Sequence, residues 1–353
     1  MTTGLYRISY GNLKNIIAEK IYNTTSIDLT RPTQVFAIIN KRCVSRCVMC
    51  DSWRVKDPPE LAASVWIRFL SEMKKFNPYF SINFTGGEPL CKKDFLEILE
   101  FCSREGILAG FTTNGFLLTP AVVDRLMRMT LFNIHISIDS LNEKVHDRAR
   151  GTPGALKLVL RNLDYLLERK GILKSKTAII IKANVFDENL DDLEGLAVFC
   201  RKKGLNGLIF QPILKWTKGA EEMFRVDQTK LKNTIGKMIA MKRAGYPILD
   251  SESQLKAWVD HFNDQTSRRN GYCPVALRDL SIEPDGRMML CDMVESTIGN
   301  IQHDDIATLW RSERVRKMRS TLMHCTGPCT SASAVKRTFK DYLELFRSLA
   351  SGR

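Results

Sequence analysis

The sequence predicts an α/β protein: a partial parallel barrel of six β/α units, followed by a small C-terminal domain built from a β-hairpin and a helix. Strand-like runs alternate with helical segments six times, the alternation stops after Ile213, and a hairpin signal appears near residue 280. The 353 residues suffice for about two domains. Their apolar fraction of 44% and charged fraction of 26% are typical of a globular protein.

Six short runs rich in apolar residues predict the barrel strands. They are residues 35–40, 80–84, 107–112, 132–138, 177–184 and 207–211. The segments with helical periodicity between them are residues 62–75, 93–105, 121–128, 155–170 and 190–203. Because the strands look apolar with little alternation, we expect both faces of the sheet to be covered. A closed eightfold barrel needs more units, so an open barrel of six is favoured.

The remaining chain divides around this barrel. We expect an N-terminal helical extension over residues 1–33, the barrel over 34–215 and a helical connector over 216–270, with helices at 230–243 and 254–262. Residues 271–332 are expected to form the second domain, in which Pro284-Asp285-Gly286 is the turn of the hairpin. A final amphipathic helix is expected over residues 333–353.

Two apolar stripes are predicted near the ends of the chain. The first consists of Leu13, Ile16, Ile17 and Ile21, and the second of Val335, Phe339, Tyr342, Phe346 and Leu349. Packing against the barrel is the favoured interpretation, and contact with a membrane surface is the alternative. The chain has no apolar run long enough to span a bilayer and no signal-peptide pattern at residues 1–10, so we expect a cytoplasmic protein.

The formal net charge of +14 indicates anionic partners. The basic residues are spread along the chain, and no basic stretch is interleaved with aromatic residues that would stack on bases. We therefore expect an anionic small molecule rather than a nucleic acid.

Three cysteines follow the first strand directly. Cys43, Cys47 and Cys50 form a C-x3-C-x2-C motif. Three thiolates in one loop suit a soft metal centre such as an iron–sulfur cluster, and in a four-iron cluster they leave one iron open. A zinc knuckle that lacks one ligand, or three unrelated cysteines, are the alternatives.

Polar motifs follow the next strands. Gly86-Gly87-Glu88-Pro89 comes after the second strand, where paired glycines would let the backbone approach a ligand and the carboxylate would accept a bond from an ammonium group. Thr113-Asn114-Gly115 ends the third strand and Ser137-Ile138-Asp139 the fourth. His146-Asp147-Arg148-Ala149-Arg150-Gly151 follows, and Asn184 and Gln211 lie late in the fifth and sixth strands.

Over about residues 34–215 these motifs resemble the radical S-adenosylmethionine (SAM) superfamily. The resemblance implies a [4Fe–4S] cluster on Cys43, Cys47 and Cys50 whose open iron chelates SAM. It implies SAM contacts from Gly86, Gly87, Glu88, Thr113, Asn114, Ser137, Asp139, Arg150, Asn184 and Gln211. Among these, Arg150 would pair with the methionine carboxylate, a task that suits a guanidinium. For Ser137, Asn184 and Gln211, an ordinary polar strand end is the alternative.

The resemblance also implies a reaction. An electron donor such as flavodoxin or ferredoxin would reduce the cluster, and SAM would then yield methionine and a 5′-deoxyadenosyl radical that abstracts a hydrogen atom from the substrate.

A second group of cysteines lies near the C-terminus. It consists of Cys273, Cys291, Cys325 and Cys329. The Cys273-x12-Gly286-x4-Cys291 spacing brackets the hairpin and resembles the start of the SPASM and twitch extensions of radical SAM enzymes. That resemblance implies one auxiliary [4Fe–4S] cluster, and a four-cysteine zinc site is the alternative.

The other three cysteines lie outside both groups. Cys102 and Cys200 are predicted core residues. Cys91 is a candidate hydrogen-atom donor to a substrate radical, with a plain first-turn helix residue as the alternative.

The substrate expected from the sequence is a small anionic or sugar-like metabolite that is oxidised or epimerised in a biosynthetic pathway. The alternatives are a peptide, RNA or lipid substrate, or a non-enzymatic iron–sulfur or zinc protein that binds nucleic acid. With only about 33 residues before the first strand, we expect no separate leader-peptide domain, which demotes a ribosomal peptide.

Overall fold

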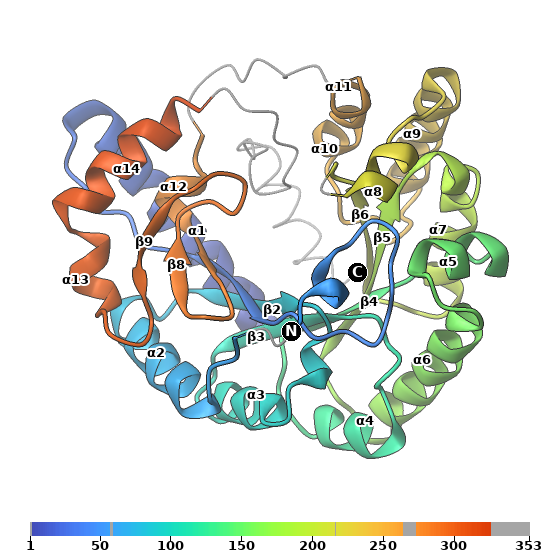
Figure 1. Ribbon diagram of the computed structural model, residues 1–353, viewed down its shortest axis with the longest axis horizontal. Helices are drawn as coiled ribbons and strands as arrows, with labels where there is room; N and C mark the ends of the chain where they lie inside the picture. Colours follow the sequence, from blue (N-terminus) through green and yellow to red (C-terminus); the bar gives the residue numbers. More distant parts are fainter. Residues whose placement is uncertain (1, 57–58, 216, 264–272, 326–353) are drawn as a thin grey trace.

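The computed structural model describes residues 2–56, 59–215, 217–263 and 273–325. Six parallel strands form its centre (Figure 1). They are β1 (Gln34–Asn40), β2 (Ser81–Gly86), β3 (Leu108–Thr113), β4 (Asn133–Ser137), β5 (Ala178–Val185) and β6 (Gly207–Pro212). Each strand pairs in parallel with the next one along the chain. The predicted partial (β/α)6 barrel is confirmed.

Helices cover the outer face of this curved sheet (Figure 1). They are α2 (Ala63–Phe76), α3 (Phe95–Arg104), α4 (Pro120–Met127), α5 (Glu143–Arg150), α6 (Ala155–Ile172) and α7 (Leu193–Lys202). The sequence supports their boundaries: Thr119 caps α4 by accepting from Val122 N ahead of Pro120, and Gly151 ends α5 with a left-handed φ of 60°.

The predicted hairpin is present, and it continues the barrel sheet. β7 (Asp279–Ile282) pairs in parallel with β1, and β8 (Arg287–Met289) and β9 (Thr297–Asn300) extend the sheet in antiparallel fashion. Three helices flank these strands: α12 (Val275–Arg278), α13 (Ile306–Trp310) and α14 (Glu313–Met323). One nine-stranded sheet therefore runs through both predicted domains.

The expectation that both faces of the strands are apolar and covered was wrong. Alternate residues such as Val35, Ala37 and Ile39 of β1 are fully buried in the core beneath the helices. The residues between them, on the inner face, are half-buried in most strands and largely polar. Those half-buried polar residues include Gln34, Ser81, Asn83, Thr112, His135, Lys182, Asn184 and Gln211. A partial barrel has no complete opposite wall to pack against this face, so polar side chains are tolerated there.

The described part of the predicted connector, residues 217–263, forms four helices beside β6. They are α8 (Lys218–Met223), α9 (Gln228–Arg243), α10 (Glu252–Lys256) and α11 (Trp258–Phe262). The single helix expected over residues 254–262 is thus two short ones. Trp258 anchors them, with its ring 5.4 Å from that of Phe210 in β6 and at a steep angle to it.

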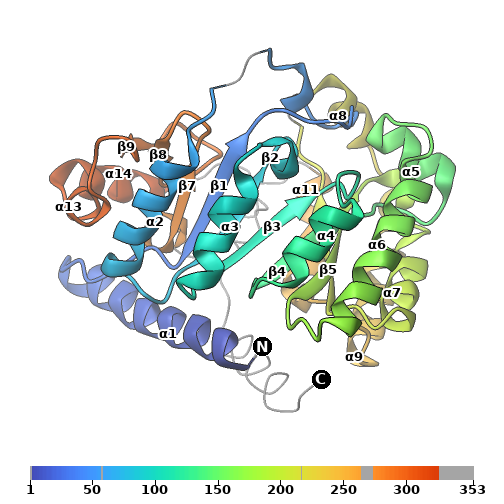
Figure 2. The same ribbon diagram turned by 90° about the horizontal axis from the view of Figure 1, so that it is seen from below.

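The N-terminal helix α1 (Thr2–Thr25) does not bury its predicted apolar stripe. Leu13 and Ile17 are 48% and 53% exposed, so the favoured packing was wrong. The helix is docked by a polar side chain instead: Asn15 Nδ2 donates to Leu277 O at 3.1 Å, and Asn15 Oδ1 accepts from Arg31 N at 3.0 Å. Figure 2 shows α1 at the end of β1 opposite its arrowhead.

The expected C-terminal amphipathic helix and its stripe lie outside the described residues. Among the described helices, none has both the length and the hydropathy needed to cross a membrane.

Candidate active site

The cysteine loop leaves β1 at its carboxyl end, and hydrogen-bond donors surround its sulfurs. Cys43 Sγ accepts from Ser45 N at 3.4 Å and from Asn114 Nδ2 at 3.7 Å. Cys47 Sγ lies 3.2 Å from Ser45 Oγ and 4.0 Å from Arg150 Nη1. Such donors stabilise thiolate charge. Burial, opposed by the Ser45 N–H, raises the pKa of the Cys43 thiol to about 12.

Among the described residues, no three His, Cys, Asp or Glu side chains lie so that they could bind a single metal ion. The three thiols of the cysteine loop are included in that statement. Cys50 is the third of these thiols. Its backbone N–H donates to Cys47 O at 3.2 Å, which keeps it in the same turn.

The glycine pair holds the cysteine loop in place. Gly87 N donates to Asn40 O at 2.9 Å, and Glu88 N donates to Arg42 O at 2.7 Å. A Cβ on Gly87 would lie 2.2 Å from Arg42 O, and one on Gly86, whose φ is +126°, would lie 2.2 Å from Asn40 O. The absence of side chains therefore lets the end of β2 pack on the backbone that leads into the cysteines.

The Glu88 carboxylate is fully buried and joins two strand ends. Its Oε2 accepts from Thr113 Oγ1 at 3.0 Å and from Asn114 N at 2.8 Å, and its Oε1 accepts from Leu90 N at 3.2 Å. Burial raises the pKa of Glu88 to about 7, although these donors act in the opposite direction. Because both oxygens are engaged within the chain, the carboxylate orients the Thr113-Asn114 turn, and through Asn114 it supports Cys43.

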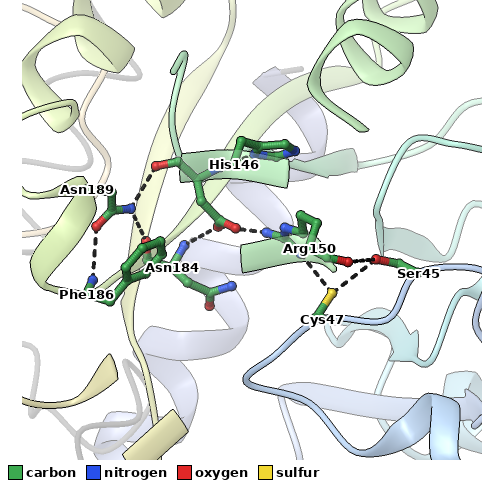
Figure 3. A network of polar contacts seen from close by, with 8 residues as sticks. Ser45, Cys47, His146, Arg150, Asn184, Phe186 and Asn189 are labelled. Atoms are coloured by element: carbon green, nitrogen blue, oxygen red, sulfur yellow. Dashed lines mark hydrogen bonds and ion pairs between the residues drawn. The ribbon is translucent and has the colours of Figure 1, made fainter. Parts of the chain in front are cut away.

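A buried ion pair connects the cysteine loop to the ends of β4 and β5 (Figure 3). Asp139 Oδ1 accepts from Arg150 Nη2 at 2.7 Å and from Asn184 N at 2.8 Å. Asp139 N donates to His146 Nδ1 at 3.2 Å, and burial lowers the pKa of His146 to about 4, so the neutral ring is a ready acceptor. Asn189 Nδ2 donates to both Asp139 O and Asn184 O at 2.7 Å.

Two atoms of this ion pair are left unsatisfied within the described residues. Asp139 Oδ2 and Arg150 Nε are buried and have no hydrogen-bond partner there. Burial opposes the charge of Arg150, but the Asp139 carboxylate raises its pKa overall, so the guanidinium stays charged. A buried donor and a buried acceptor without partners are costly unless a ligand satisfies them. Next to the Cys47 thiol, they suit a ligand that carries both a carboxylate and hydroxyl groups, as SAM does.

The structure brings most of the predicted residues to one place. Polar contacts join Cys43, Cys47, Glu88, Thr113, Asn114, Asp139, Arg150 and Asn184. Ser137 is buried at the end of β4. Gln211 Nε2 donates to the carbonyl of the adjacent Pro212 at 3.2 Å.

Cys91 contacts the cysteine loop. It ends a short 3-10 helix (Pro89–Cys91), and its thiol accepts from the backbone N–H of Val44. Burial raises its pKa.

Two residues whose side chains hydrogen-bond to the site, Ser45 and Asn189, were not predicted from the sequence. Ser45, between the first two cysteines, donates from Oγ to Arg150 O at 2.9 Å as well as contacting Cys47. Its position inside the motif was an available signal. Asn189 ends a short 3-10 helix (Asp187–Asn189) after β5, and the sequence offers no pattern that would single it out.

Two cysteines of the second group lie together, and a third follows the end of α14. Cys273 and Cys291 pack around Val275 in one small cluster. Cys273 N donates to Met323 O at 3.0 Å, which places Cys273 next to the end of α14, and Cys325 N donates to Leu322 O at 3.0 Å. Cys329, the predicted fourth member, lies outside the described residues.

An ion pair ties the two regions together. Lys41 Nζ, at the start of the cysteine loop, lies 3.2 Å from Glu283 Oε2, just after β7.

Residues 37–199 match the radical SAM superfamily model. Residues 273–331 match the SPASM model, described as an iron–sulfur cluster-binding domain. The barrel therefore belongs to the radical SAM superfamily, whose domain binds a [4Fe–4S] cluster and SAM. The C-terminal region belongs to the SPASM domains, which bind an auxiliary iron–sulfur cluster.

Curated relatives match parts of the chain. The mycofactocin maturase MftC of Mycolicibacterium smegmatis is 28% identical over 163 residues, 46% of this chain and 40% of that protein. The AdoMet-dependent heme synthase of Nitratidesulfovibrio vulgaris is 24% identical over 279 residues, 70% of each chain. This chain thus spans about two fifths of the length of the maturase.

Solved structures share the fold. Streptococcus suis SuiB bound to SAM superposes with a TM-score of 0.70 at 17% identity, covering 94% of this chain and 81% of SuiB. Native anSMEcpe with bound AdoMet and Cp18Cys peptide gives a TM-score of 0.65 at 16% identity, covering 91% of this chain and 99% of that one. At these identities the similarity concerns the fold alone.

Proposed function

We propose that this radical SAM enzyme abstracts a hydrogen atom from a C–H bond of a peptide, as one step in its maturation. Relatives supply the support for a peptide: SuiB has been solved with its precursor peptide SuiA, and anSMEcpe with an added peptide. The AlbA protein of subtilosin biosynthesis in Bacillus subtilis is 22% identical over 84% of this chain. The small anionic metabolite expected from the sequence is the second candidate, favoured by the polar inner face of the barrel and the net charge of +14.

The main structural support for the use of SAM is the Asp139–Arg150 ion pair beside Cys47, which has two atoms without hydrogen-bond partners among the described residues. We assign Cys43, Cys47 and Cys50 to the [4Fe–4S] cluster and Arg150 to the carboxylate of SAM. Asp139 Oδ2 would accept a bond from a SAM hydroxyl or ammonium group.

The remaining predicted SAM contacts come from neighbouring strand ends. Ser137, Asn184 and Gln211 would line the nucleoside side of SAM, and Gly86 and Gly87 would present backbone groups to its methionine end. Glu88, Thr113 and Asn114 would act as positioning residues, since their side chains bind one another and Cys43. SAM bound there supplies a 5′-deoxyadenosyl radical once a donor such as flavodoxin or ferredoxin delivers an electron.

The SPASM region is assigned the second cluster. Cys273, Cys291, Cys325 and Cys329 would hold it, and it would supply an electron acceptor, which suits a net oxidation. Cys91 is a weaker candidate for hydrogen-atom donation, because its thiol lies against Val44 of the cysteine loop. Reduced cysteines and two clusters require a reducing compartment such as the cytoplasm.

Deuterium transfer distinguishes the substrate classes. Reconstituted, dithionite-reduced enzyme would be incubated with SAM and perdeuterated short peptides encoded beside its own gene, or with deuterated sugar acids. Deuterium in 5′-deoxyadenosine from a peptide supports the first candidate. Transfer from the sugar acids, with none from any peptide, would replace it by the second.

A further inference from the structure

A lysine lies on the inner face of the barrel, close to the proposed SAM pocket. The strand register pairs Lys182 of β5 with Ser137 of β4 and with Ile209 of β6. Paired residues project from the same face of a sheet, so Lys182 shares the inner face with Ser137. It precedes Asn184 by two residues, which sets it about 7 Å deeper in the barrel than that predicted SAM contact.

This ammonium group has no partner within the described residues. No hydrogen bond or ion pair there joins Lys182 Nζ, although the residue is half-buried. Burial lowers the pKa of Lys182, as does the charge of Arg150, while Asp250 raises it. Asp250 does not form an ion pair with it, and its Oδ2 accepts from Phe210 N at 3.0 Å. The arrangement leaves a cation that has lost part of its hydration and has no counter-ion in contact, which is unfavourable unless a ligand supplies one.

The neighbours of Lys182 on this face are uncharged: Ile209 beside it is apolar, and the others are polar. His135 of β4 lies two residues before Ser137 along the strand, and it is paired in register with Thr112 of β3. Burial and the charge of Lys182 lower the pKa of His135 to about 3, so its ring is neutral. Thr112 Oγ1 donates to Asn83 Oδ1 at 3.3 Å. One cation among neutral hydrogen-bonding groups matches a singly charged carboxylate better than an apolar group or a doubly charged phosphate.

We propose that Lys182 is the substrate-anchoring residue of this enzyme and that it binds a carboxylate of the substrate inside the barrel. In a peptide, that carboxylate is an Asp or Glu side chain or the C-terminus. The inference rests on the proposed function, in which the substrate enters the inner face beside SAM. Because Arg150 is already assigned to the carboxylate of SAM, Lys182 is available to the second ligand.

Lysine acetylation of the holoenzyme tests this inference without knowing the substrate. Reconstituted enzyme would be treated anaerobically with N-hydroxysuccinimidyl acetate, and the rate at each lysine read by mass spectrometry. The probes are succinate and its neutral diamide, succinamide. Succinate at saturating concentration should slow acetylation of Lys182 at least about threefold, because a bound anion shields the amine. Succinamide should not, and Lys157, an exposed lysine on α6, should be unaffected by either.

Two outcomes would overturn the inference. Equal effects of succinate and succinamide would show that charge is not recognised. Equal protection by SAM alone would assign the ammonium to the carboxylate of SAM. Formation of 5′-deoxyadenosine in the same preparation, before labelling, reports separately on the proposed function.

Matched variants provide a second measurement. Succinate should raise the unfolding temperature of the wild-type holoenzyme and of Lys182→Arg, which keeps the charge, but not that of Lys182→Gln. A succinate-dependent rise in Lys182→Gln as large as that of the wild type would contradict the inference.

Discussion

Substitution of Gly87 by alanine tests whether the glycine pair supports the cysteine loop. The new Cβ would lie 2.2 Å from Arg42 O and 2.7 Å from Arg42 C, whereas ordinary contacts begin at 3.4 Å. Both are backbone atoms, so no flexible side chain can move aside. Relieving the overlap requires the backbone one residue before Cys43 to move by about 1 Å, at a cost of about 1–3 kcal/mol.

The assay is iron content after anaerobic reconstitution, together with the unfolding temperature. The wild type should carry about eight iron atoms per chain and Gly87→Ala about four, because the first cluster is lost and the second is kept. Gly236→Ala is the matched control. Gly236 lies within α9 with no heavy atom within 4 Å of an added Cβ, so that variant should keep all its iron and gain up to about 1 kcal/mol of stability. Full iron content and an unchanged unfolding temperature in Gly87→Ala would refute the reasoning.

Four other perturbations have expected outcomes. Glu88→Ala leaves three donors without an acceptor, so it should lower the free energy of unfolding, measured by urea denaturation, by about 3 kcal/mol. Glu97→Ala, which changes an exposed side chain, should alter that free energy little. Equal effects of the two substitutions would contradict the buried network around Glu88. The pKa of Glu88 is raised from 4.5 to about 7 in the folded state, so its stabilising contribution is complete below pH 4.5 and is lost as the pH rises through 7. Relative to Glu88→Gln, the free energy of unfolding of the wild type should fall by at most about 1.4 kcal/mol per pH unit in that window. Parallel curves of unfolding free energy against pH for the two proteins would contradict the raised pKa. Cys291→Ser should lower the iron content to about four while SAM cleavage persists, and unchanged iron would exclude Cys291 as a ligand. Arg150→Lys should weaken SAM binding about tenfold in equilibrium dialysis, since an ammonium cannot form two parallel bonds to a carboxylate, and an unchanged dissociation constant would remove Arg150 from the site.

Much of the barrel could be predicted because its signals are local. The six strands begin and end within about two residues of the expected positions, since each apolar run is bounded by turn-forming or charged residues. The polar motifs stand at the carboxyl ends of parallel strands, which meet at one edge of a sheet. That geometry alone brings Asn114, Asp139 and Asn184 towards the cysteine loop.

The features that escaped prediction depend on distant partners. The pairing of β7 with β1 joins Asp279 to Gln34 across most of the chain, and no local pattern encodes it. The docking of α1 relies on Asn15 and backbone groups, whereas an apolar stripe suggested Leu13 and Ile17. Lys182 lies within an apolar run, and only the strand register shows that it faces inward. The packing of Gly86 and Gly87 against the backbone of Asn40 and Arg42 was not predicted either, because those contacts join residues more than forty positions apart.

Reductive cleavage of SAM tests the central claim most directly. Anaerobically reconstituted enzyme, reduced with dithionite, should convert SAM to methionine and 5′-deoxyadenosine. Cys43→Ala should abolish this product, while Cys102→Ala, which alters a buried core thiol in α3, should retain it. Absence of 5′-deoxyadenosine from the fully reconstituted wild type, or equal activity in Cys43→Ala, would contradict the account.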